Sequence, residues 1–224
     1  MRIQKKLLTR ASTFSFLFCV GFTQLVQASQ TVIHAGKLVD VENSKVLSNQ
    51  AIVIEGEKII SVQAFDKKKY ANSNIIDWSA YTVTPGLMDM HTHLAGDIQF
   101  ADTEAYLRAK PEDDVLIGVH NALKTLQAGF TTVRDVGSYN AFVDVSLRDA
   151  INKSWVVGPR MYVAGAYVTI PGGGGEVSGL VDADRIPARM RVGVAKGDAQ
   201  VSEKTNYILD HGVDWIKMIV TGAV

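Results

Sequence analysis

The sequence predicts an α/β protein: an incomplete (β/α)8 TIM-type barrel of about four βα units, preceded by a small β-sandwich-like segment. Two observations lead to this prediction. Residues 31–81 contain several short runs rich in β-branched side chains, and after His93 such runs alternate with helical patterns. Strands that alternate with helices in this way form right-handed βαβ units and a parallel sheet.

Residues 1–28 are predicted to be a signal peptide. The first ten residues carry four basic side chains and no acidic one, and the apolar run 14–22 follows them. The segment 26–28 ends in a small residue of the kind that signal peptidase reads, so we expect cleavage after Ala28. Because the apolar run is short for a membrane span, we expect an exported protein, periplasmic or secreted, with no membrane attachment after cleavage. A retained N-terminal anchor helix is the alternative.

Cleavage changes the charge of the protein. The whole chain has 23 basic and 23 acidic residues, and loss of four basic ones leaves 19 and 23, a net charge of −4. A mildly acidic chain without a basic patch argues against a nucleic-acid partner. The single cysteine, Cys19, leaves with the leader. We therefore expect no disulfide and no thiol chemistry, and any metal must be held by nitrogen and oxygen atoms.

The segment 29–82 is the small β-rich part. A compact hairpin connection at Glu55–Glu57 joins two of its strands. His34 lies in this segment, and we expect it to be structural or exposed rather than a ligand. The expected strands are 31–36, 51–55, 58–62, 74–77 and 81–84.

Residues 83–224 are predicted to be the N-terminal half of a β/α barrel. Its first helix begins at Pro111 with acidic residues in the first turn and ends at Gly129. The other expected helices are 141–151 and 197–210, the strands after the first are 130–136, 160–164 and 213–220, and a glycine-rich segment spans 167–176. Because a full barrel typically needs about 250 residues and the chain ends after the fourth strand, we expect the sequence to be incomplete.

The stretch Val83–His93 carries the first candidate metal ligands. If it is a strand, His91 and His93 point to the same face, with Asp89 behind them. Two imidazoles on one face at the C-terminal end of a strand can hold a divalent ion. A bare His-x-His is weak evidence, but the preceding Pro-Gly and the apolar surroundings strengthen it. His120 and His211 have structural explanations, in helix packing and at a helix C-terminus respectively.

Lys217 is the second decisive residue. It lies within an apolar run, where an unpaired charge is costly, and alternation places Trp215, Lys217 and Ile219 on one face, which would line the barrel interior. Desolvation lowers the pKa of a lysine, and the neutral amine becomes nucleophilic. Such an amine can capture carbon dioxide as a carbamate that bridges two metal ions. The alternative is an ordinary lysine that pairs with a carboxylate or reaches solvent.

These motifs together resemble a known family. The stretch Thr84–Leu94 resembles the first barrel strand of the metal-dependent amidohydrolase superfamily. The segments Ala128–Gly137, Gly158–Arg160 and Gly212–Lys217 are similar to its imidazolonepropionase-related branch, which includes Xaa-Pro dipeptidases. The resemblance covers nearly all of residues 31–224.

The resemblance implies a binuclear centre. His91 and His93 would bind the more buried of two divalent ions, zinc in our expectation, and Lys217, as a carbamate, would bridge both. A metal-bound hydroxide would attack the amide carbonyl of a small peptide or amide substrate. The family's two further histidines and its general-base aspartate have no counterpart here, so we assign no catalytic residue within this chain and expect that aspartate beyond residue 224. Some relatives carry a histidine after the third strand, where this chain has Pro171–Glu176.

Three functions stay open at this point. The first is a fragment of an exported dipeptidase-like hydrolase; the second is a mononuclear deaminase or cyclic-amide hydrolase of the same superfamily, against which Lys217 argues; the third is a non-catalytic truncated remnant. We expect the 224 residues alone to show no hydrolase activity, and the sequence does not decide the oligomeric state. Arg134 and Asp135, which close the second strand, can support the metal ligands by hydrogen bonding or form a structural ion pair.

Overall fold

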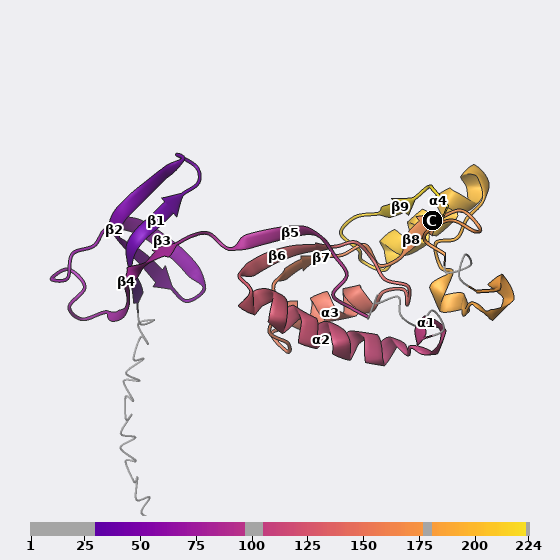
Figure 1. The fold of residues 1–224 in the computed structure, drawn as a ribbon, viewed down its shortest axis with the longest axis horizontal. Helices are drawn as coiled ribbons and strands as arrows, with labels where there is room; N and C mark the ends of the chain where they lie inside the picture. Colours follow the sequence, from indigo (N-terminus) through magenta and orange to yellow (C-terminus); the bar gives the residue numbers. More distant parts are fainter. Residues whose placement is uncertain (1–29, 97–104, 177–180, 223–224) are drawn as a thin grey trace, which may run out of the picture. The chain divides into compact units, whose positions relative to one another are not determined.

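A computed structural model describes residues 30–96, 105–176 and 181–222. The predicted signal peptide lies outside these residues. The chain divides into two compact units between Thr84 and Pro85 (Figure 1). Among the described residues, no helix has both the length and the apolar character that a membrane crossing requires.

The first unit is a single four-stranded sheet with the order β3-β2-β1-β4. Strands β1 and β2 pair antiparallel, as do β2 and β3 around the turn at Gly56, whereas β4 lies parallel to β1. The segment that was expected to hold two short strands is the one continuous strand β4. The strands are β1 Thr31–Asp40, β2 Lys45–Glu55, β3 Lys58–Ala64 and β4 Asn74–Val83.

One face of this sheet is covered by a loop. Val32, Ala51 and Val53 are buried on it beneath Tyr70, and Phe65 packs against them. Ile76 and Trp78 on β4 remain about two-fifths exposed. Within the described residues of this unit the loop after β3 supplies the hydrophobic cover of the single sheet, and the expected sandwich-like arrangement stays a prediction.

The second unit is built from parallel strands. β5 (Leu87–Thr92), β6 (Phe130–Asp135) and β7 (Arg160–Tyr162) form one parallel sheet, and β8 (Tyr167–Thr169) pairs parallel with β9 (Lys217–Ile219). The order along each sheet follows the order along the chain. The βαβ arrangement that the sequence predicted is thus present.

Strands β7 and β8 lie on either side of a bend. Gly165 has a φ of +75°, a conformation that favours glycine, and its backbone nitrogen donates to the buried carboxylate of Asp144 at 2.8 Å. The backbone nitrogen of Asp214 donates to Val163 beside this bend, at 2.9 Å. The bend therefore redirects the chain from one sheet to the other while the segment before β9 stays attached to it.

Helices cover one side of the sheet β5-β6-β7 (Figure 1). Ala122 and Leu147, one from each of two helices, join the strand residues Val133 and Met161 in the largest buried cluster. Helix α2 begins at Pro111 with three acidic residues in its first turn, as the sequence predicted. The helices are α1 Ala105–Arg108, α2 Pro111–Gln127, α3 Val143–Asn152 and α4 Gly197–Asp210, with short 3-10 turns at Ala183–Arg185 and Ala188–Met190.

Candidate metal centre

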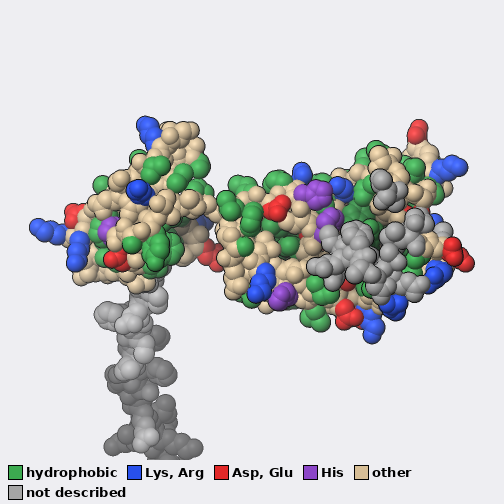
Figure 2. Space-filling model, viewed as in Figure 1, with side chains coloured by type: hydrophobic (Ala, Val, Ile, Leu, Met, Phe, Trp, Pro, Cys, Tyr) green, Lys and Arg blue, Asp and Glu red, His purple; other side chains and the backbone are tan. Residues whose placement is uncertain are grey.

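His91 and His93 lie at the C-terminal end of β5. Their ring centroids are 5.6 Å apart in an edge-on arrangement. His91 is exposed and His93 is partly buried. Figure 2 shows histidine side chains gathered beside a basic side chain on the visible face of the second unit. The strand pattern therefore brings both imidazoles to the same end of the parallel sheet.

The ring of His93 is fixed by a backbone acceptor. Its Nδ1 lies 2.7 Å from the carbonyl oxygen of Gly137, in the loop after β6. The hydroxyl of Tyr167, on β8, donates to the same carbonyl at 3.0 Å and lies 3.4 Å from Nδ1. A carbonyl accepts but does not donate, so the proton of neutral His93 resides on Nδ1. Its Nε2 lone pair is consequently available to a metal ion.

Burial favours the neutral form of His93 by lowering its pKa from the ordinary value. The charges of His91 and Lys217 lower this pKa further, while the hydrogen bond to Gly137 opposes them. A neutral imidazole is the form that binds metal. The protonation state and the tautomer of His93 thus agree with the requirements of a metal ligand.

Lys217 lies on the same side of the β8–β9 pair as Tyr167. The two residues are direct partners in the parallel register, and Tyr167 contacts His93 edge-on, with ring centroids 6.3 Å apart. Lys217 is only partly buried, while its neighbour Met218, on the opposite face, is 54% exposed. The structure therefore brings Lys217 close enough to His93 for its charge to lower the pKa of that imidazole.

Asp89 and Asp135 both support the strand that carries the histidines. Asp89 accepts a hydrogen bond from the backbone nitrogen of His91 at 3.0 Å. Oδ2 of Asp135 accepts one from the backbone nitrogen of Leu94 at 2.6 Å and lies 3.4 Å from the hydroxyl of Thr92. Both carboxylates thereby hold backbone on either side of His93 without contacting the imidazoles themselves.

Arg134 points away from Asp135. Its Nε donates to the carbonyl oxygen of Met90 at 2.7 Å, and its guanidinium carbon lies 4.8 Å from the ring centroid of Trp215. Asp135 is fully buried on the other face of β6. The two neighbours therefore do not form the ion pair that was one interpretation of their sequence, and Arg134 instead joins β5 to the segment before β9.

Asp135 is one of two interacting buried carboxyl groups. Burial raises its pKa to about 8, with a further contribution from the charge of Asp144, which is also fully buried. Burial raises the pKa of Asp144 as well, against hydrogen bonds from backbone nitrogens. Within the described residues Oδ1 of Asp135 has no hydrogen-bond partner. At neutral pH the protonated form of Asp135 therefore predominates.

Tyr167, Gly137 and Asp144 are site residues that sequence reasoning missed. Tyr167 was placed in a glycine-rich segment, whereas it begins strand β8. The alternating run Tyr-Val-Thr was the available signal for a strand. Asp144 gave no such signal, because its role depends on a contact with Gly165 that sequence spacing does not reveal.

The glycine-rich segment that follows β8 is packed rather than open. The backbone nitrogen of Gly174 donates to Thr221 at 2.8 Å, and that of Gly172 donates to Glu176 at 2.7 Å. A Cβ on Gly175 would lie 2.8 Å from Cβ of Tyr167. This segment therefore packs directly against the strand that supports His93.

The donor set fits a divalent ion only if Lys217 takes part. Among the described residues, no group of three or more His, Cys, Asp or Glu side chains is placed to hold a metal. His91 and His93 supply two nitrogens, and Lys217 would have to supply oxygen as a carbamate. The orientation of His93, with Nε2 available, is the observation that favours this set.

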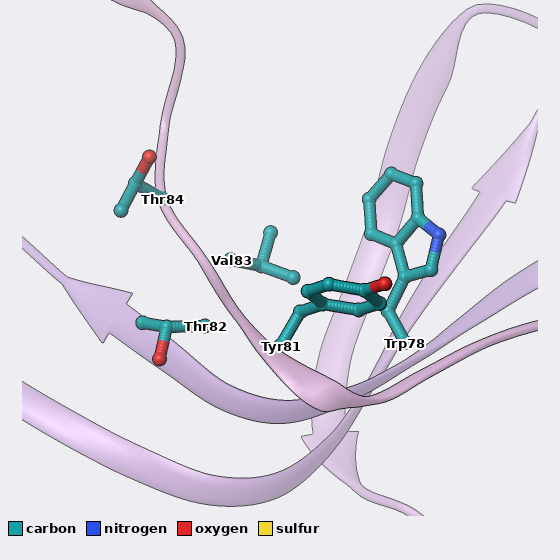
Figure 3. Close-up of a pocket in the computed structure, with 5 residues that line it drawn as sticks. All are labelled: Trp78, Tyr81, Thr82, Val83 and Thr84. Carbon is teal, nitrogen blue, oxygen red and sulfur yellow. The ribbon is translucent and has the colours of Figure 1, made fainter.

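The remaining histidines and a separate hollow do not contribute ligands. His34 stacks on Phe65 and His211 on Phe142, with centroids 3.7 and 4.0 Å apart, and His120 is exposed on α2. A hollow of about 440 Å³ in the first unit is lined by Trp78, Tyr81, Thr82, Val83 and Thr84 (Figure 3). It lacks a metal-binding side chain, so the second unit remains the candidate site.

Comparison with known proteins shows a matching family and similar structures. The sequence model of the amidohydrolase family matches residues 82–224. The chain is 28% identical to ochratoxinase of Aspergillus niger over 213 residues, covering 88% of the chain and 43% of that protein. The structure is similar to that of a Xaa-Pro dipeptidase with methionine bound in the active site, with a TM-score of 0.74 and 33% identity over 88% of the chain and 48% of the dipeptidase.

A third relative shows the same partial coverage. A prolidase complexed with N-methylphosphonate-L-proline is 26% identical, with a TM-score of 0.69, over 85% of this chain and 46% of that protein. The chain thus spans about half the length of the relatives it matches. The fold is shared with proteins that are roughly twice as long.

Proposed function

The chain belongs to the amidohydrolase family, and from this premise we propose that it forms the first, metal-binding half of a hydrolase that cleaves carbon–nitrogen bonds. The first four βα units of an eight-stranded barrel would be the part present. The observation that carries the proposal is His93, whose Nδ1 is held by the Gly137 carbonyl at 2.7 Å. This bond leaves Nε2 available beside His91 and near Lys217.

The residues that would hold two divalent ions, zinc in our proposal, are His91, His93 and a carbamate on Lys217. The carbamate forms when the neutral amine of Lys217 attacks carbon dioxide and releases one proton. Such ions, when bound, supply Lewis acidity, which activates water at neutral pH and polarises a carbonyl. The chain's own contribution is orientation: Gly137 and Tyr167 fix the ring of His93, and Asp89 holds the backbone of His91.

We propose a small peptide or amide as the substrate, with dipeptidase-like specificity. The support is the similarity to a Xaa-Pro dipeptidase and to a prolidase bound to a proline derivative. We also propose export to the periplasm or secretion, supported by the basic and then apolar pattern of residues 1–28. Both proposals concern the whole protein that this chain represents.

Metal counting and hydrolysis together test the function. Protein made from the complete reading frame of the gene should bind two zinc ions per chain and hydrolyse Xaa-Pro dipeptides, and His93→Ala should abolish both. One zinc ion per chain with activity on a cyclic amide or an amino-substituted heterocycle would favour the mononuclear alternative. Absence of zinc binding in the wild-type protein would refute the proposal.

A further inference from the structure

One pocket of the second unit is lined by two cationic side chains. It is an open depression of about 390 Å³, lined by Ile186, Ala188, Arg191, Val194 and Lys204. Pockets that take small ligands usually have roughly 300–1,000 Å³. None of the five lining residues belongs to the proposed metal centre, so the pocket needs an explanation of its own.

Arg191 is held in a fixed orientation. Its Nε pairs with Oε1 of Glu176, whose side chain is only 1% exposed. The second carboxylate oxygen of Glu176 accepts a hydrogen bond from the backbone nitrogen of Gly172 at 2.7 Å. Within the described residues, the two terminal nitrogens of Arg191 make no further hydrogen bond. A guanidinium fixed through Nε presents these nitrogens as a ready-made pair of donors.

Lys204 supplies a second cation from helix α4. Its side chain is 36% exposed, and its ion-pair partner is Glu203, at 3.4 Å and 70% exposed. A pair this open to solvent contributes little binding energy, so Lys204 remains available to an incoming anion. The pocket thus has two cationic groups, one of them rigid, from two different segments of the chain.

The remaining walls of the pocket are apolar. Ile186 is buried against Met190. Val194 forms an isolated bridge with Thr169 of β8, and the next residue, Ala195, donates its backbone nitrogen to Thr169 at 2.8 Å. These bonds fix the wall to the sheet. The pocket therefore has cationic side chains on one side and apolar side chains on the other. This combination favours a ligand that has both an anionic group and an apolar part.

We propose that this pocket binds a small organic carboxylate with a branched or linear apolar tail. The planar guanidinium of Arg191 matches the two oxygens of a carboxylate, Lys204 adds a second positive charge, and Ile186, Ala188 and Val194 receive the tail. Phosphate shares the charge but has no apolar part to occupy these walls.

The experiment titrates the metal-free 224-residue protein with 4-methylpentanoate, followed by amide NMR shifts and calorimetry. Metal-free protein keeps the outcome independent of the proposed metal centre. Saturable binding is expected, with shifts at Val194 and Lys204. The neutral isostere 4-methylpentanamide and inorganic phosphate should each bind at least tenfold more weakly.

Lys204→Met should weaken 4-methylpentanoate binding by about five- to tenfold while the melting temperature stays within experimental error, because the lysine is on the helix surface. Lys124→Met, which removes an exposed lysine from α2, is the matched control and should bind like the wild type. Equal affinity for acid and amide, tighter binding of phosphate, or unchanged binding in Lys204→Met would each overturn the proposal.

Discussion

His93 and Tyr167, which are 74 residues apart, share one acceptor, the carbonyl oxygen of Gly137. The imidazole Nδ1 lies 2.7 Å from it and the phenol oxygen 3.0 Å. Strands β5 and β8 and the loop after β6 therefore meet at a single backbone atom. The orientation of the candidate ligand depends on all three segments.

Tyr167→Phe removes one of the two donors to this carbonyl while keeping the ring that packs beside His93. We expect zinc affinity to fall by roughly tenfold, since groups that orient a metal-binding histidine typically contribute 10- to 100-fold. Competition with a chromogenic chelator measures the change. Tyr207→Phe alters an exposed tyrosine of α4 and should leave zinc affinity unaltered; a loss of the same size in both variants would assign the effect to general destabilisation.

His91→Ala and His93→Ala each remove one proposed ligand. Either should lower zinc affinity by at least about 100-fold, more than loss of a group that only orients a ligand. Equilibrium dialysis with elemental analysis reports the bound zinc. His120→Ala removes an exposed histidine of α2 and serves as the control, with full binding expected. If His120→Ala lost as much zinc as His93→Ala, the assignment of the site would be mistaken.

Lys217→Met retains the length of the side chain but has no amine. After equilibration with zinc and 13C-labelled bicarbonate, the wild type should show a carbamate carbonyl signal by NMR, and this variant should lack it. The variant should also bind one zinc ion fewer, because the bridging anion is gone. Persistence of the signal in Lys217→Met would place the carbamate on another amine.

Asp135→Asn tests the consequence of the raised pKa. Because the pKa of Asp135 is about 8 in the folded protein and about 3.9 in an unfolded chain, the folded state holds the extra proton between these values. Its stabilising effect is complete below the unfolded pKa and is lost as the pH rises through about 8.

The free energy of unfolding of the wild type should thus fall by about 3 kcal/mol more than that of Asp135→Asn between pH 5 and pH 8. Urea unfolding at several pH values gives both curves. Parallel curves would mean that Asp135 does not hold a proton that the unfolded chain releases.

Local signals in the sequence were sufficient to predict several elements of the second unit. Pro111 with the acidic residues after it marked the start of α2, and α4 was expected at the residues where it is found. These features depend on capping and on periodicity within a few turns. The family prediction was also confirmed, because the motifs around His91 and Lys217 lie within the matched residues.

Long-range packing decided what the sequence did not reveal. The cover over β1 and β2 comes from the loop with Phe65 and Tyr70, and no periodicity distinguishes such a loop from a strand of a second sheet. The contact between Asp144 and Gly165 and that between Tyr167 and Gly137 join different βα units. Local sequence patterns do not predict such contacts, because they form only when the strands lie side by side.

The crowding around Gly173–Gly175 has a consequence for how this protein can diversify. Glycine is often associated with a flexible backbone. At Gly173, however, a Cβ would lie 2.3 Å from Oγ1 of Thr169. Because these glycines have no side chains, the segment can lie in direct contact with β8. A lineage that acquired a larger residue here would have to rebuild the neighbouring strand too, so variety in substrate preference should arise first in loops anchored elsewhere on the rim.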